Sequence, residues 1–122
     1  MAGCVVLCFA AAAVASPDVL TFGKGRPVPP GDVAAGQNIY NAVCWACHDR
    51  DLGGYKGPPL TGRSFYKIWR GRSANELSDL IRNQMPKDDP GWLTDKSAHD
   101  LVAYIVTYAN NPKSLAGERA GK

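Results

Sequence analysis

The sequence predicts a small all-α domain. Three observations support this: apolar residues recur at helical spacing, capping residues precede those stretches, and no stretch reads as a convincing β-strand. The chain of 122 residues has room for one domain, and its 45% hydrophobic and 20% charged residues are ordinary for a globular protein. A domain this small buries only roughly 60–65% of its unfolded surface, so a disulfide, a metal or a cofactor inside it would add much to its stability.

The beginning of the chain, residues 1–15, is interpreted as a secretory signal peptide. Its apolar stretch is shorter than the ~20 residues of a spanning helix, and Ala13-Val14-Ala15 has the small-x-small pattern of a signal-peptidase site. No Lys or Arg precedes Lys24, so an uncleaved anchor or a buried N-terminal helix stays open as an alternative. Residues 16–31 are rich in Pro and Gly and are expected to form a leader. We expect no stable membrane span once the signal is removed.

The predicted domain covers residues 32–110 and opens with a helix. Asp32 is a favourable N-cap, and the helix is expected to extend through about Val43. Several glycines and prolines between Arg50 and Gly62 then predict a loop.

Two further helices are expected after this loop. A short one covers Phe65–Trp69, capped by Ser64. The next opens at Ser73-Ala74-Asn75-Glu76, which is a capping-box signature, and has apolar residues at i, i+3 and i+4. Pro86 ends it.

The last predicted helix starts after Thr94 or Ser97. Asn110-Asn111-Pro112 terminates it, and residues 111–122 are expected to be a polar tail. Its apolar stripe consists of Leu101, Tyr104, Ile105 and Tyr108.

The strongest chemical signal is the run Cys44-Trp45-Ala46-Cys47-His48. Two thiols three positions apart near a helix end can add across the two vinyl groups of one haem, and the adjacent histidine then lies under the iron as a ligand. The sequence therefore predicts one covalently attached haem c, with Cys44 and Cys47 binding the cofactor and His48 binding the metal.

Three other interpretations of the two cysteines stay open. A thioredoxin-like redox pair would need an α/β fold, for which no strands are predicted. A structural zinc site would need four ligands, and Cys44, Cys47, His48 and His99 together make four. A plain disulfide is the third possibility.

The second iron ligand is predicted to be Met85. Apart from Met1 in the signal, it is the sole thioether of the chain, and Pro86 after it restricts the backbone. A lone methionine is often only core filler. His99 is the imidazole alternative, but it is expected on the polar side of its helix, beside Asp100, and in contact with solvent.

Residues 32–110 resemble a class I cytochrome c of the bacterial periplasm. The resemblance implies a small fold of three main helices and one short helix around a single haem. It also implies that Gly36 and Tyr40 let the first helix cross the last one closely at Tyr104, and that the Pro58 carbonyl accepts a hydrogen bond from the haem histidine. The residues that carry it are Gly36, Tyr40, Cys44, Cys47, His48, Gly57-Pro58-Pro59-Leu60, Met85-Pro86 and Tyr104.

A narrower resemblance concerns the partners. The run from Phe65 through Trp69-Arg70-Gly71 to Met85-Pro86 and Pro90-Gly91 is similar to cytochrome domains found with quinoprotein dehydrogenases. It implies a pyrroloquinoline quinone (PQQ) dehydrogenase as electron donor. Related cytochromes have a Trp that contacts the haem or a propionate, which suggests Trp69 as a further cofactor-binding residue, although ordinary core packing would explain it equally well.

The expected function is a periplasmic electron carrier, not an enzyme, operating between a dehydrogenase and a downstream cytochrome oxidase. Alternatives are a haem c subunit of a quinoprotein dehydrogenase complex, or a five-coordinate haem peroxidase or sensor if Met85 is not bound. We expect the protein to bind no nucleic acid and to have no stable membrane span. The segment from Lys56 to Lys87 contains seven basic residues and only two acidic ones, Glu76 and Asp79, in a chain of net charge +3. This predicts a basic surface that offsets the haem propionates and steers an acidic partner.

Overall fold

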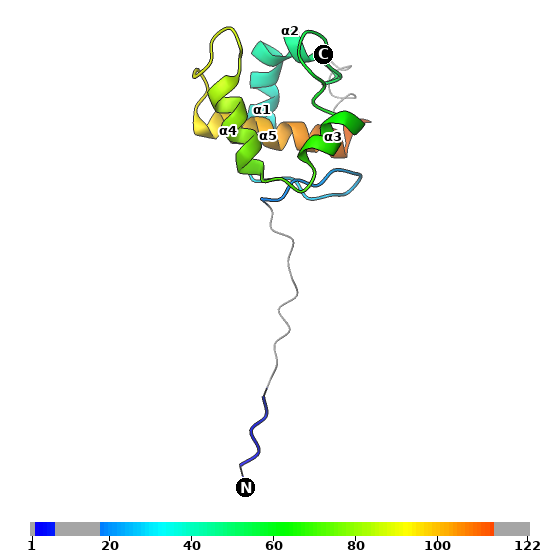
Figure 1. Ribbon diagram of the computed structural model, residues 1–122, viewed down its shortest axis with the longest axis vertical. Coiled ribbons are helices and arrows are strands. Elements are labelled where there is room, and N and C mark those ends of the chain that lie inside the picture. Colours follow the sequence, from blue (N-terminus) through cyan, green and yellow to red (C-terminus); the bar gives the residue numbers. More distant parts are fainter. Residues whose placement is uncertain (1, 7–17, 114–122) are drawn as a thin grey trace.

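The computed structural model describes residues 2–6 and 18–113 of the chain, and within these residues it is helical (Figure 1). An isolated β-bridge joins Val19 to Ser73, and no strand forms in the described part of the chain, which confirms the all-α prediction. The elements are α1 (Val33–Ile39), the π-helix η1 (Tyr40–Cys44), α2 (Trp45–His48), α3 (Arg63–Trp69), α4 (Ala74–Gln84) and α5 (Asp95–Asn110).

Helix α5 is the centre of the arrangement. Figure 1 shows α1 crossing it, with α4 and α3 toward its two ends. The crossing is close because residue 36 is glycine: a Cβ there would lie 2.0 Å from the Asp100 carbonyl oxygen. The rings of Tyr40 and Tyr104 pack with their centroids 5.4 Å apart beside this point. The crossing expected from Gly36, Tyr40 and Tyr104 is thus confirmed.

The first helical run starts where expected and extends further. The Asp32 side chain accepts a hydrogen bond from the Ala35 amide at 3.0 Å, as an N-cap does. The run was expected to end near Val43, but it continues through η1 and α2 to His48. The π-helical turn holds one extra residue per turn, which is a feature that apolar periodicity does not reveal.

Helix α4 begins with the capping box that the sequence predicts. The Ser73 side chain accepts from the Asn75 amide at 3.0 Å, and the Glu76 carboxylate accepts from the Ser73 amide at 3.1 Å. Met85 is the residue that ends the helix. Of the two candidate starts of α5, Thr94 is the N-cap, because its side chain accepts from the Ser97 amide at 3.1 Å.

The short helix α3 begins earlier than predicted. Gly62, not Ser64, is its N-cap, with a positive φ of 88° and no side-chain hydrogen bond. Ser64 is instead an exposed residue inside the helix. The helix ends at Trp69, as expected.

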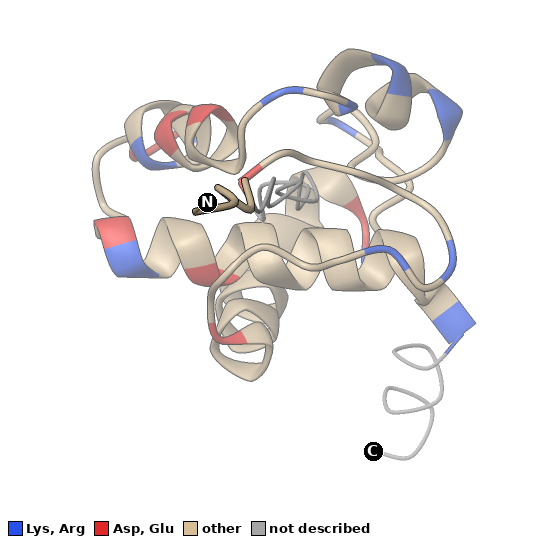
Figure 2. Cartoon of the chain, turned by 90° about the horizontal axis from the view of Figure 1, so that it is seen from below, with Lys and Arg blue, Asp and Glu red and all other residues tan. Residues whose placement is uncertain are grey.

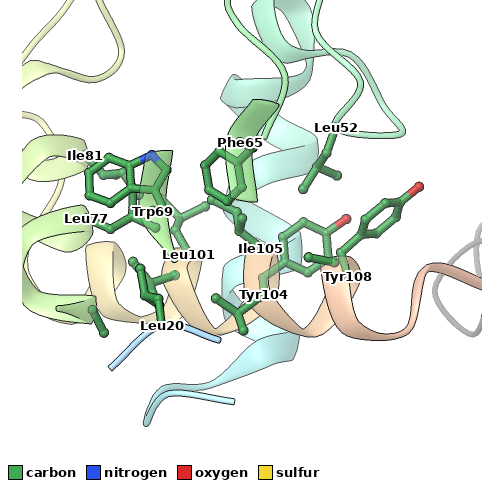
Figure 3. Close-up of a cluster of buried hydrophobic side chains, with 14 of the residues drawn as sticks. Leu20, Leu52, Phe65, Trp69, Leu77, Ile81, Leu101, Tyr104, Ile105 and Tyr108 are labelled. Carbon is green, nitrogen blue, oxygen red and sulfur yellow. The ribbon is translucent and has the colours of Figure 1, made fainter. Parts of the chain in front are cut away.

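The core is built mainly from α5 together with residues of α3 and α4 (Figure 3). All four residues of the predicted α5 stripe are buried. Phe65 and Trp69 from α3 and Leu77 and Ile81 from α4 belong to the same buried cluster as this stripe.

The Pro- and Gly-rich segment before α1 also contributes to the core. Leu20 is fully buried and Phe22 is 7% exposed. The Leu20 amide donates to the Arg72 carbonyl at 2.8 Å, and the Gly71 amide donates to the Leu20 carbonyl at 3.0 Å. Residues 18–31 form no helix, and through Leu20 and Phe22 this segment packs on the helical domain, which its composition did not indicate.

The remaining terminal predictions fall largely on residues that the structure does not describe. These are most of the expected signal peptide and the tail from residue 114 onward. No helix in the described ranges is long and apolar enough to cross a membrane.

Candidate functional site: an apolar cavity beside the cysteine–histidine motif

The end of the first helical run presents the two cysteines and the histidine. Cys44 closes η1 and is half-buried, whereas Cys47 in α2 is exposed. Burial, and to a smaller extent the neighbouring Cys47, raises the pKa of the Cys44 thiol to about 11. His48 is the last residue of α2 and is only 8% exposed, so its ring points into the protein.

The imidazole of His48 is held in one orientation. Its Nδ1 lies 2.8 Å from the Pro58 carbonyl oxygen. A carbonyl can only accept, so Nδ1 carries a proton, and in the neutral ring this leaves the lone pair on Nε2. Such a hydrogen bond also raises the basicity of the other nitrogen toward a metal. The hydrogen bond implied for Pro58 by the resemblance is present.

Gly57 provides the space that the imidazole occupies. A Cβ at this position would lie 2.8 Å from His48 Cε1 and 3.0 Å from Nδ1, so any side chain would displace the ring. The Gly57 amide donates to the Cys47 carbonyl at 2.7 Å, which ties the loop back to α2.

The loop after His48 is also fixed from the core side. The hydroxyl of buried Tyr40 donates to the Asp49 carbonyl, and Asp49 has a positive φ of 68°. The Gly54 amide donates to the His48 carbonyl at 2.9 Å. Helix η1 and the loop therefore hold the histidine between them, a role of the tyrosine hydroxyl that the sequence analysis missed.

A cavity of about 650 Å³ lies beside the motif. This volume is within the range of roughly 300–1,000 Å³ typical of small-molecule and cofactor sites. All six residues predicted for the site contribute to its lining, namely Cys44, Cys47, His48, Pro58, Trp69 and Met85.

Most of the other lining residues are apolar. Phe65, Ile81, Leu101 and Ile105 belong to the buried core and also border the cavity. From the sequence, Leu101 and Ile105 of α5 are expected only to pack against other side chains. Periodicity identifies a buried helix face, but it cannot distinguish a face that packs on side chains from one that packs on a cofactor.

Met85 and Trp69 reach the cavity from different elements. Met85 is half-buried and directly follows α4, and its peptide bond to Pro86 is cis. Trp69 is 7% exposed, and its ring centroid lies 6.3 Å from that of Phe65. The guanidinium carbon of Arg72 lies 4.3 Å from the indole centroid on the outer side of α3.

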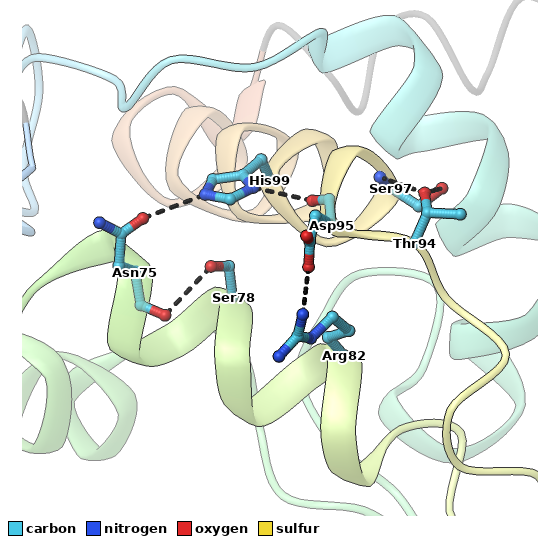
Figure 4. A network of polar contacts seen from close by, with 7 residues as sticks. All are labelled: Asn75, Ser78, Arg82, Thr94, Asp95, Ser97 and His99. Atoms are coloured by element: carbon cyan, nitrogen blue, oxygen red, sulfur yellow. Dashed lines mark hydrogen bonds and ion pairs between the residues drawn. The ribbon is translucent and has the colours of Figure 1, made fainter.

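His99 does not line this cavity. Its Nδ1 donates to the Asp95 carbonyl at 2.7 Å, and its Nε2 lies 3.0 Å from Asn75 Oδ1 (Figure 4). The residue therefore connects α5 to α4 and is only partly exposed, whereas we expected it in solvent. The zinc alternative would need His99 beside the cysteines, whereas its two ring nitrogens contact Asp95 and Asn75. In the described residues, no group of three or more His, Cys, Asp or Glu is arranged to hold a metal ion.

The donor set and the cavity fit a covalently attached haem. Two thiols in Cys-x-x-Cys spacing border an apolar cavity of cofactor size, next to an imidazole whose Nε2 lone pair is available.

Comparisons with known proteins agree with this assignment. Residues 31–105 match the family described as cytochrome c oxidase, cbb3-type, subunit III. The chain is 31% identical over 102 residues to a thiosulfate dehydrogenase of Stutzerimonas stutzeri (75% of this chain, 33% of that one). It is 28% identical over 94 residues to the cytochrome c subunit of 4-cresol dehydrogenase (hydroxylating) of Pseudomonas putida (71% and 75%). It is 32% identical over 90 residues to cytochrome c-555 of Prosthecochloris aestuarii (62% and 86%).

A solved structure shares the fold. The crystal structure of the sulfane dehydrogenase SoxCD from Paracoccus pantotrophus matches with a TM-score of 0.53 and 22% identity, covering 78% of this chain and 51% of that one. The chain spans only about a third of the thiosulfate dehydrogenase and half of the SoxCD chain. The family match and the cytochrome relatives show that this chain contains a cytochrome c domain with covalently bound haem c and iron, and that it belongs to the class I c-type cytochrome family.

Proposed function

We propose that this chain is an electron carrier in which Cys44 and Cys47 hold haem c, and His48 and Met85 are the two iron ligands. The observation that carries the proposal is that all four side chains border one apolar cavity of cofactor size. When bound, the haem supplies reversible one-electron oxidation and reduction of its iron.

The surrounding residues set the properties of this site. The Pro58 carbonyl fixes the tautomer of His48 and strengthens Nε2 as a ligand. The soft sulfur of Met85 favours ferrous iron and raises the reduction potential. The apolar lining from α3, α4 and α5 excludes water. With His48 and Met85 both binding the iron, the chain would leave no ligand position open for a substrate, which suits a carrier and not an enzyme.

Trp69 is proposed as a wall of the same site. Its indole is buried, lines the cavity and lies against the Arg72 guanidinium. This position keeps the ring rigid, so it shields the cofactor from solvent on the α3 side.

We place the carrier in the periplasm, with a dehydrogenase, including the PQQ-dependent kind, as donor and a cytochrome oxidase as acceptor. The similarity to the 4-cresol dehydrogenase cytochrome c subunit supports a dehydrogenase donor. The same similarity favours a second candidate, a permanent subunit of a dehydrogenase complex. Gel filtration of a periplasmic extract separates the two, because a subunit elutes with dehydrogenase activity and a carrier elutes alone.

Replacing the proposed sulfur ligand tests the site. In Met85→Ala we expect covalent haem to be retained, the low-spin spectrum to become high-spin and the reduction potential to fall. His99→Gln is the control, and it should keep both the spectrum and the potential of the wild type. A Met85→Ala protein with unchanged spectrum and potential would remove Met85 from the ligand set, and a matching loss in His99→Gln would assign the ligand to that histidine.

The wild-type protein also separates a carrier from a five-coordinate peroxidase or sensor. A carrier with two protein ligands should show a ferrous spectrum that carbon monoxide barely alters. A large, immediate spectral change with carbon monoxide would favour an open iron site and contradict the proposal.

A further inference from the structure

Helix α3 has two chemically different sides. Phe65, Ile68 and Trp69 line the apolar cavity. Arg63, Lys67 and Arg70, spaced i, i+4 and i+7, lie on the other side, are exposed, and border a surface depression of about 460 Å³. The helix thus presents an apolar face to the site and a basic face to solvent.

Tyr66 forms a fixed part of this depression. Its ring stacks on Phe22 with centroids 4.7 Å apart. Its hydroxyl lies 3.0 Å from Thr61 Oγ1 and donates to the Ala109 carbonyl at 3.3 Å. Because these contacts join α3 to α5 and to the N-terminal segment, the three cations surround a rigid surface.

More basic residues lie on the same side of the molecule. The segment with Lys24 and Arg26 is held there by Asn110, whose side chain accepts from the Gly23 amide at 2.9 Å and donates to the Arg26 carbonyl at 3.2 Å. Figure 2 shows Lys and Arg over α3, over the segment before α1 and at the end of α5, and it shows Asp and Glu over α4, the start of α5 and several loops.

We call this region the α3 basic surface. It consists of Lys24, Arg26, Arg63, Lys67, Arg70 and Lys113, all exposed. Within residues 18–113, none of the six forms an ion pair with a carboxylate; the cations that do are Arg72, Arg82 and Lys96. The whole chain has a net charge of +3, so the remainder carries a net charge of −3. The α3 basic surface therefore carries a charge opposite in sign to the net charge of the remaining residues.

We propose that the α3 basic surface is the docking surface for an acidic protein, the redox partner of this cytochrome. The inference rests on the proposed electron-carrier function and names the partner's chemistry. Six cations without carboxylate partners on one side orient an acidic surface toward it over a distance of about a Debye length. A duplex nucleic acid or an anionic membrane, each larger than this domain, would also meet the acidic remainder. A compact acidic protein surface fits the charge distribution better.

This placement differs from the expectation that the basic residues between Lys56 and Lys87 form the surface that steers an acidic partner. Arg72 and Arg82 from that segment are engaged with Glu76 and Asp95. Lys24, Arg26 and Lys113 come from outside it. A partner on the α3 basic surface would be separated from the cavity by one helix, whose diameter is about 10–12 Å with side chains.

Charge reversal on the holoprotein tests the inference, with poly-L-glutamate as the acidic probe. We expect Arg63→Glu/Lys67→Glu to weaken the binding of poly-L-glutamate at least tenfold at low ionic strength. The matched control is Arg50→Glu/Arg82→Glu, which changes the net charge equally at two cations that neither line the cavity nor belong to the α3 basic surface. It should bind within about twofold of wild type, and the wild-type affinity should fall with added salt.

Three outcomes would overturn the inference. Equal losses in both double variants would mean that only the net charge matters. Inorganic phosphate binding as tightly as poly-L-glutamate would indicate a small-anion site. Vesicles with an anionic phospholipid binding where poly-L-glutamate does not would indicate a membrane surface. The haem spectrum and potential of each variant, measured with small mediators, report on the proposed function separately. A missing redox response refutes the carrier, whereas a normal response without probe binding refutes only the docking surface.

Discussion

Gly36→Ala tests the helix crossing on which the fold depends. The new Cβ would lie 2.0 Å from the Asp100 carbonyl oxygen and 2.9 Å from Tyr104 Cβ. Real contacts essentially never fall below 3.0 Å, so α1 and α5 must separate by about 1 Å. A gap of that size loses roughly a quarter to a half of the dispersion energy of the contacts involved. Overpacking of this kind costs about 1–3 kcal/mol, and the backbone contact favours the upper end.

Helix propensity opposes this overpacking cost, so the direction of the change in stability of Gly36→Ala shows which effect is larger. In a helix that packs on nothing, Gly→Ala would stabilise by about 1 kcal/mol through helix propensity. We therefore expect a net loss of about 2 kcal/mol in the free energy of unfolding of Gly36→Ala. Urea unfolding of the holoprotein, followed by far-UV circular dichroism, measures it, and Ala34→Gly on the exposed side of α1 calibrates propensity in the same helix. A stabilised Gly36→Ala protein would refute the close crossing.

Two further perturbations test other parts of the fold. Leu20→Ala should reduce the free energy of unfolding by about 2–4 kcal/mol, since Leu20 is fully buried. The control Val28→Ala, at an exposed residue of the same segment, should change it by less than about 0.5 kcal/mol. Equal effects of the two substitutions would refute the packing of this segment. Burial raises the pKa of Asp100, but hydrogen bonds from Lys96 and the Asp32 amide outweigh it, so the net pKa is lowered. The carboxylate thus stabilises the fold above its unfolded pKa, and this contribution is lost as the pH falls through the folded pKa. Asp100→Asn should therefore be less stable at neutral pH and lose less stability on acidification; parallel pH profiles would contradict this.

The elements that the sequence predicted well are those with local signals. The capping box at Ser73 and the buried stripe of α5 depend on residues within one or two turns of each other, and both appear as expected. The candidate site was predictable for a similar reason. The spacing of Cys44, Cys47 and His48 is set by the cofactor's own dimensions, so the motif identifies the chemistry without tertiary information.

The features that the sequence did not predict depend on long-range contacts. Leu20 lies in a Pro- and Gly-rich segment, and its backbone is hydrogen-bonded to Arg72 and Gly71, about fifty positions away. The hydroxyl of Tyr40 has a partner, the Asp49 carbonyl, only because η1 continues into α2 and the loop turns back. His99 looked solvent-exposed from its own helix alone, since its second partner, Asn75, is on α4.

The N-terminal segment and the site are connected through α3. The Leu20 backbone bonds to the residues after Trp69, and Phe22 stacks on Tyr66 within the helix. Helix α3 has only 7 residues, too few to be stable in isolation, so these contacts hold it in place. Its inner side then presents Phe65 and Trp69 to the cavity, while its outer side presents the cations. A segment that looks like a linker by composition therefore supports both the wall of the cavity and the proposed docking surface.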